Sequence, residues 1–130
     1  MKKIVLDTNA YTSLLLGDEG ILDALTKADI VWVPVFVLGE LYAGFCGGNK
    51  EKENRLLLER FLQKPTVAIL DATQETAEIF GQLMHTLKAA GNPLPLNDVW
   101  IAAQVIETGA MLVTFDAHFQ KIPGLRIWRF

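Results

Sequence analysis

The sequence predicts an α/β fold in which helices cover both faces of a central parallel β-sheet, giving three layers. Short apolar segments alternate with helical segments along the chain, which is typical of parallel strands joined by crossover helices. The strand candidates lack polar alternation, as expected for strands buried on both faces. Two of them run directly into an acid, Asp7 and Asp116. Ligands of such sheets bind at the carboxyl ends of strands.

The first half of the chain is divided by glycines and a proline. Pro34 closes a strand because it cannot donate to the ladder, and Gly17 and Gly47 follow helical segments, where glycine is favoured. Apolar residues recur at helical spacing between them. In chain order we expect a strand over residues 3–6, helices over 11–16 and 21–28, a strand over 30–33 and a helix over 36–45.

The second half begins with a strongly amphipathic segment and continues the alternation. Gly91 and Pro93 end a long helical pattern, and Gly109 ends the next one. In chain order we expect a helix over residues 52–63, a strand over 67–70, helices over 73–90 and 97–108, a strand over 111–115 and a short strand over 125–128.

Length and composition limit the classes of protein. A chain of 130 residues predicts one domain, spanning residues 1–130, and 51% hydrophobic with 21% charged residues excludes disorder. Neither a signal peptide nor a membrane span is expected, and the only cysteine, Cys46, excludes an internal disulfide and is expected to fill the core. A cytoplasmic location follows. The net charge of −3 disfavours general nucleic-acid coating but permits an acidic site that carries cations.

Four acids stand in or beside apolar sequence: Asp7, Glu40, Asp98 and Asp116. Each has an ordinary explanation on its own. Asp7 and Asp116 suit helix caps, Asp98 suits the first turn of its helix, and Glu40 could lie on an exposed helix edge. If Glu40 is buried in its apolar helix, it needs compensation by a cation or a raised pKa.

A shared site explains the four acids together. Gathered carboxylates repel one another and raise each other's pKa, and divalent cations relieve that repulsion. Oxygen ligands suit Mg²⁺ or Mn²⁺. His85 and His118 are isolated in the sequence and are expected to be structural, so zinc is disfavoured. Hard cations in an open carboxylate site are suited to phosphodiester hydrolysis.

Four segments, IVLDTN, LGELYAG, PLNDVWIAA and LVTFDAHF, resemble the PIN-domain ribonucleases, and in particular the VapC-type toxins of type II toxin–antitoxin systems. The resemblance covers essentially the whole chain and implies a PIN-like fold. It implies that Asp7, Glu40, Asp98 and Asp116 are the catalytic and metal-binding residues, with Mg²⁺ or Mn²⁺ as cofactor. It also implies polar supporting roles, for which we expect Asn9 and Thr114 to orient carboxylates or waters and Asn97 to cap its helix; Thr8 belongs to the same set.

The implied activity is that of a metal-dependent endoribonuclease, a hydrolase that leaves 5′-phosphate and 3′-hydroxyl ends. Transfer RNA is the first candidate substrate, with rRNA and mRNA as alternatives. The resemblance further implies a homodimer and a cognate antitoxin, a small DNA-binding protein that inhibits the toxin. The helix over residues 52–63 carries more apolar residues than one narrow stripe holds. We therefore expect the core and a partner to cover different sides of it.

Lys52, Arg55 and Arg60 are candidate RNA-binding residues on the same helix. Acids interleave with them, so a solvated face with paired charges is the simpler interpretation. The sequence lacks residues that two other classes of protein require. A receiver-like signalling domain needs paired acids after its first strand, and an aspartyl-nucleophile phosphatase needs an acid where Asn9 stands. A catalytically inactive scaffold and a housekeeping RNA-processing nuclease remain alternatives.

Overall fold

The computed structural model describes all 130 residues, and its centre is a four-stranded sheet with the order β3-β2-β1-β4. Every pairing is parallel. The first strand therefore lies in the interior of the sheet, between the second strand and the last one. The strands are β1 (Lys3–Leu6), β2 (Ile30–Pro34), β3 (Val67–Leu70) and β4 (Met111–Val113).

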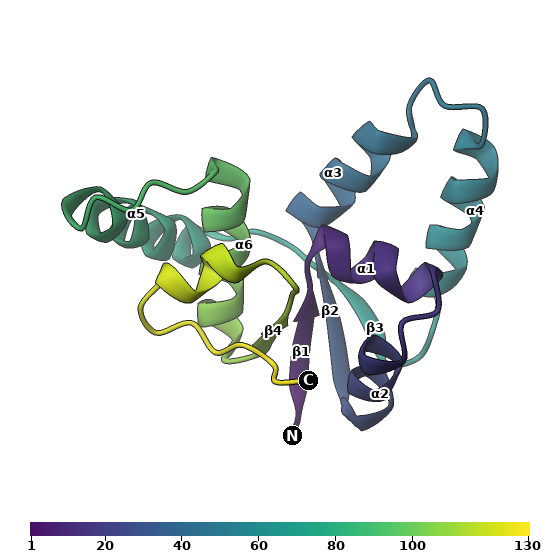
Figure 1. Ribbon diagram of the computed structural model, residues 1–130, viewed down its shortest axis with the longest axis horizontal. Coiled ribbons are helices and arrows are strands. Elements are labelled where there is room, and N and C mark those ends of the chain that lie inside the picture. The colour runs from purple at the N-terminus through teal and green to yellow at the C-terminus, as the bar shows by residue number, and fades with distance from the viewer.

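Helices cover the sheet on both sides, which confirms the predicted three-layer α/β fold. In Figure 1 the helices α5 and α6 lie on one side of the strands, and α1 to α4 lie on the other. The helices are α1 (Thr8–Leu15), α2 (Glu19–Lys27), α3 (Val35–Phe45), α4 (Glu51–Leu62), α5 (Gln74–Ala89) and α6 (Leu96–Thr108), followed by the 3₁₀ helix η1 (Ala117–Lys121).

The central strand β1 is buried on both faces because helices pack against each of them. Ile4, Val5 and Leu6 are fully buried, and they belong to a continuous core of 28 buried apolar residues. Such a strand has no solvent face, so its sequence is uniformly apolar until it ends. Asp7 comes directly after this strand and is the first polar side chain at the carboxyl edge of the sheet.

The predicted strand over residues 125–128 is wrong. This segment forms only one isolated parallel bridge, between Leu112 and Ile127, supported by two backbone hydrogen bonds to Leu112. Two contacts at one residue do not make a ladder. The strand predicted over 111–115 also ends earlier, at Val113, because the chain turns toward η1, which the sequence did not predict.

Two further observations concern Cys46 and membrane-spanning helices. Cys46 is exposed in the loop after α3, so the prediction that it fills the core is wrong. No helix in the structure combines the length and the apolar character that a membrane crossing requires.

Candidate active site

Asp7 lies at the junction of β1 and α1, and its two carboxylate oxygens have different partners. Oδ1 accepts a hydrogen bond of 2.8 Å from the backbone N–H of Ala10, which makes Asp7 the N-cap of α1. Oδ2 accepts a hydrogen bond from the hydroxyl of Thr114, just past β4. The side chain is only 4% exposed. Asp7 therefore links the ends of two neighbouring strands.

Asp116 lies two residues after Thr114 and is held by it. Its backbone N–H donates to the Thr114 hydroxyl over 2.9 Å. Its carboxylate accepts from the backbone N–H of His118 and caps η1. The Thr114 hydroxyl thus joins Asp7 and Asp116 into one hydrogen-bonded unit at the carboxyl edge of β1 and β4.

Asp98 reaches the same site from the first turn of α6, where the helix dipole favours a carboxylate. His118 connects it to Asp116. The imidazole Nε2 lies 2.7 Å from Asp98 Oδ2, and Nδ1 lies 2.7 Å from Asp116 Oδ1. The sequence analysis did not place His118 at this site, since we expected it to be isolated. Its position two residues after an acid of the site was the available signal.

Glu40 approaches the site from the middle of α3 but stays exposed, so the buried alternative considered for it is wrong. Its carboxylate accepts a hydrogen bond of 2.9 Å from the hydroxyl of Thr8, the residue next to Asp7. Asn9 is exposed in the first turn of α1. Asn97 does not cap α6, because the helix already begins at Leu96; its amide instead donates to the Phe36 carbonyl over 3.5 Å.

The electrostatics couple the acids to one another. Burial raises the pKa of Asp7 above its ordinary value of 3.8, Asp98 and Asp116 add to the rise, and the hydrogen bonds from Thr114 and Ala10 oppose it. Burial likewise raises the pKa of Asp98, with further contributions from Glu40 and Asp116 and opposition from His118. All four carboxylates therefore belong to one electrostatic cluster.

The donor chemistry of this cluster fits a hard divalent cation. The four side chains offer only carboxylate oxygens, and their mutual repulsion is the kind that such a cation relieves. No three Asp, Glu, His or Cys side chains converge as a ready-made coordination shell. In this arrangement the imidazole of His118 occupies the space between Asp98 and Asp116 and contacts both.

Comparison with known families decides the classification. The family model described as PIN domain matches residues 4–125, which include the four acids. The chain belongs to the PIN-domain family. Among curated relatives, the PIN-domain chain is 30% identical to "Ribonuclease VapC4" of Mycobacterium tuberculosis over 122 residues, covering 91% of this chain and 92% of the relative.

Two further comparisons support the same VapC-type grouping. The chain is 26% identical to "Ribonuclease VapC1" of Haemophilus influenzae over 127 residues, covering 94% of this chain and 93% of the relative. A solved structure of DNA-bound VapBC from Salmonella typhimurium superposes with a TM-score of 0.89 at 27% identity, covering 98% of both chains. The PIN-like fold predicted from the sequence is confirmed.

The candidate RNA-binding residues of this PIN domain lie on α4, and all three are exposed. The Arg55 guanidinium lies over the Tyr42 ring of α3, 4.7 Å from its centroid. Arg60 lines an apolar groove between α4 and the pair α1 and α2. Of the three residues, only Lys52 neither lies over an aromatic ring nor lines this groove.

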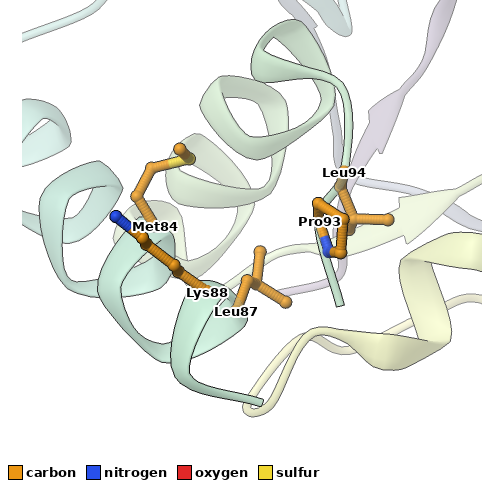
Figure 2. A pocket seen from close by; sticks show the side chains of 5 residues that line it. All are labelled: Met84, Leu87, Lys88, Pro93 and Leu94. Atoms are coloured by element: carbon orange, nitrogen blue, oxygen red, sulfur yellow. The ribbon is translucent and has the colours of Figure 1, made fainter. Parts of the chain in front are cut away.

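A separate apolar pocket of about 350 Å³ lies at the end of α5. Figure 2 shows Met84, Leu87 and Lys88 of α5 on one side and Pro93 and Leu94 of the following loop on the other. It holds no carboxylate, so it is distinct from the acidic site of the PIN domain.

Proposed function

We propose that this PIN domain is a metal-dependent endoribonuclease of the VapC toxin type. The observation that carries the proposal is the coupling of Asp7, Glu40, Asp98 and Asp116 at the carboxyl edge of the sheet. The names of the curated relatives describe ribonucleases and support the same activity. The products would carry 5′-phosphate and 3′-hydroxyl ends, and tRNA is the first substrate to test.

Each acid has a distinct task in this proposal. Asp7 and Asp116 are fixed by the Thr114 hydroxyl, so they supply the rigid part of a Mg²⁺ or Mn²⁺ site. Asp98 completes it from α6, and Glu40 adds a carboxylate that Thr8 orients from the exposed side. The cation, when bound, lowers the pKa of a water and stabilises charge on the phosphate. Asn9 is exposed next to these groups and is suited to orient a water.

His118 has a supporting task. Its ring holds Asp98 and Asp116 at a fixed spacing, although the two acids come from different elements. A positioning role therefore suits it better than that of a ligand, since both ring nitrogens are already engaged by carboxylates.

The groove beside α4 is our candidate for the antitoxin surface. It has a volume of about 470 Å³ and is lined by leucines of α1, α2 and α4, including Leu15, Leu22 and Leu57. These three are 46%, 46% and 37% exposed. Arg60 and Lys64 also line it. An amphipathic antitoxin helix with apolar and acidic side chains would complement this surface.

A second apolar surface suits the homodimer contact. Trp100 of α6 stacks on Phe80 of α5 and on Phe36 of α3, at centroid distances of 3.8 and 5.1 Å. Val35 precedes Phe36 in α3, Leu96 lies one turn before Trp100 in α6, and the two are 39% and 59% exposed. We call these five residues the aromatic face. A second copy of the chain would remove its exposed apolar area from water.

The deciding experiment is cleavage of a total RNA pool by antitoxin-free protein with Mg²⁺ or Mn²⁺, with all ends sequenced. We expect cuts bearing 5′-phosphates that require the metal and are lost in Asp7→Asn, whose folding is checked by thermal melting. Asp71→Asn, at an exposed acid outside the site, is the matched control and should cleave normally. Equal cleavage by wild type and Asp7→Asn would overturn the proposal. No cleavage by the metal-loaded wild type would favour the scaffold alternative.

A further inference from the structure

Three cationic side chains line one pocket at the amino edge of the sheet. Lys3 begins β1 and Met111 begins β4, so both lie at the edge where these parallel strands start. In Figure 1 this edge is the lower end of β1, where the N-terminus is marked. The pocket has a volume of about 310 Å³ and is lined by Met1, Lys2, Lys3, Gly109, Met111 and Arg126.

This pocket is separate from the four carboxylates of the candidate active site. Lys3 and Asp7 are four residues apart, and a parallel strand rises about 3.3 Å per residue. The start of β1 therefore lies roughly 13 Å from Asp7, and the strand between them is buried. No Asp or Glu side chain lines the pocket. Its charge is thus opposite in sign to that of the acidic site.

Three segments that are distant in sequence bring the cations together. The backbone carbonyl of Arg126 accepts a hydrogen bond of 2.8 Å from the N–H of Leu112 in β4. The carbonyl of Lys2 accepts one of 2.7 Å from the N–H of Asp29, next to β2. Lys3 belongs to β1 itself. Backbone contacts with the sheet therefore fix where the three cations leave the main chain.

None of the three cations forms an ion pair, since no carboxylate oxygen lies within 4.0 Å of their side-chain nitrogens. Lys2 Nζ lies 5.3 Å from the centroid of the Trp128 ring. A Cβ atom at Gly109 would lie 3.9 Å from Lys3 Nζ, so the missing side chain leaves this ammonium group accessible. In a chain of net charge −3, this pocket is a local site of positive charge that an anion would neutralise.

The competing explanation is that Lys3 and Arg126 only stabilise the end of α6. Lys3 Nζ donates to the Thr108 carbonyl over 2.6 Å, and the Arg126 guanidinium donates to the Gly109 carbonyl over 3.2 Å. Cations at the last carbonyls of a helix are favourable. Each contact uses one N–H, whereas lysine offers three donors and arginine five. The remaining donors have no hydrogen-bond partner in the protein.

We propose that this pocket binds a small anion that carries a phosphate group. Phosphate oxygens accept several charge-assisted hydrogen bonds at once, and arginine and lysine are the side chains that supply them. A small anion suits the pocket better than an RNA strand does. The cations converge on one place, and the buried sheet separates that place from the acids. The proposal goes beyond the nuclease function and does not depend on it.

The test is calorimetric titration of the full-length protein with inorganic phosphate, in EDTA and at constant ionic strength, so that no metal links the anion to the acids. We expect saturable binding with a Kd on the order of 1 mM or below. Lys3→Gln and Arg126→Gln keep an N–H donor but remove the charge, and each should weaken binding about tenfold. Arg129→Gln, at an exposed arginine outside the pocket, is the matched control and should bind like wild type.

Thermal melting of the same variants separates the binding role from the helix-capping role. Capping alone predicts lower melting temperatures in Lys3→Gln and Arg126→Gln and no saturable phosphate binding by the wild type. That result would overturn the proposal. Equal weakening of binding in Arg129→Gln would overturn it too, because it would indicate a general attraction of anions to the surface.

Further titrations distinguish the sources of the phosphate group. Adenosine 5′-monophosphate that binds no more tightly than inorganic phosphate indicates a free phosphate ligand. Tighter binding that Arg126→Gln also weakens indicates a phosphate monoester. If single-stranded RNA without terminal phosphates displaces inorganic phosphate, the pocket belongs to an RNA interface and the small-anion proposal is wrong. Cleavage with Mg²⁺ is measured separately, so a failure of the nuclease proposal leaves these results unchanged.

Discussion

Asp7 combines a structural role with the chemical role that we propose for it. One carboxylate oxygen caps α1 while the other accepts from Thr114. Capping and ligation were alternatives when only the sequence was considered. In the structure the cap fixes the carboxylate at the carboxyl edge of β1, as the proposed metal site would need. The capping role therefore supports the proposed role of Asp7 as a metal ligand.

The raised pKa of Asp7 leads to a prediction about stability. A carboxyl whose pKa is higher in the folded state stabilises the fold fully below its ordinary value of 3.8, and this contribution is lost as pH rises through the folded-state pKa. Asp7→Asn stays neutral. Without divalent ions at pH 7, the melting temperature of Asp7→Asn should therefore be roughly 2–5 °C above that of wild type. This difference in melting temperature should disappear near pH 4.

Thermal melting across this pH range, with and without Mg²⁺, is the measurement. Mg²⁺ should raise the melting temperature of wild type more than that of the variant, because binding to the folded state stabilises it. Asp71→Asn should behave like wild type at every pH. A wild type that is more stable than Asp7→Asn at pH 7 without metal would contradict the prediction.

At the level of single residues, sequence reasoning succeeded where strand order determines position. Asp7 and Asp116 follow parallel strands, so their shared edge was predictable. It failed where side-chain direction matters. The sequence left both a buried and an exposed Glu40 open, and the structure shows it exposed. The contact of His118 with two acids was missed, because the short 3₁₀ helix that carries it has no periodic pattern in the sequence. The catalytic roles remain predictions until the variants are measured.

Among the elements, α4 carries surfaces of different character. Leu58 and Phe61 face the core, Leu57 and Arg60 line the groove, and Lys52 lies exposed at the start of the helix. The sequence had indicated this division, because too many leucines occur for one stripe. Arg55 lies over the ring of Tyr42. This contact favours a structural role for Arg55 in joining α3 to α4.

The basic residues of α4 give a prediction at this scale. Replacing Lys52, Arg55 and Arg60 with alanine should weaken RNA binding about tenfold at low salt. If each cation contacts one phosphate of a single strand, the slope of log affinity against log salt should fall by about 2. Titrations at several salt concentrations measure both quantities. Replacing Lys2, Lys27 and Lys88 removes the same charge elsewhere and is the control; equal effects in both triple variants would reject a specific RNA contact.

At the scale of the whole molecule, single substitutions should affect the aromatic face and the groove beside α4 independently. Leu96→Lys places a charge on the aromatic face and should yield monomers that still bind antitoxin. Leu22→Lys places a charge in the α4 groove and should lower antitoxin affinity more than about tenfold while the dimer persists. Each variant is the control for the other. Sedimentation at micromolar concentration and titration with antitoxin measure the outcomes, and a monomeric wild type would contradict the dimer.

The architecture of the molecule was predictable from the sequence because alternating buried strands and helices permit few topologies. The segment over residues 125–128 was not, because its apolar residues resemble a strand while only one of them pairs with β4. The local pattern of apolar residues indicates whether a segment can be buried. It does not report whether a neighbouring strand offers enough free hydrogen-bonding groups to form a ladder.

The sheet order also has a consequence during protein synthesis. The strand β1 is synthesised first and lies between β2 and β4 in the sheet. Its neighbour β4 is the last strand to be synthesised. Asp7, Glu40 and Asp98 leave the ribosome before Asp116 and the Thr114 hydroxyl that fixes Asp7. A nascent chain thus carries most of the acids without their final arrangement. If the chain is the nuclease proposed above, we expect a nascent chain that still lacks Thr114 and Asp116 to have no nuclease activity, because the acids made before them are not yet held together.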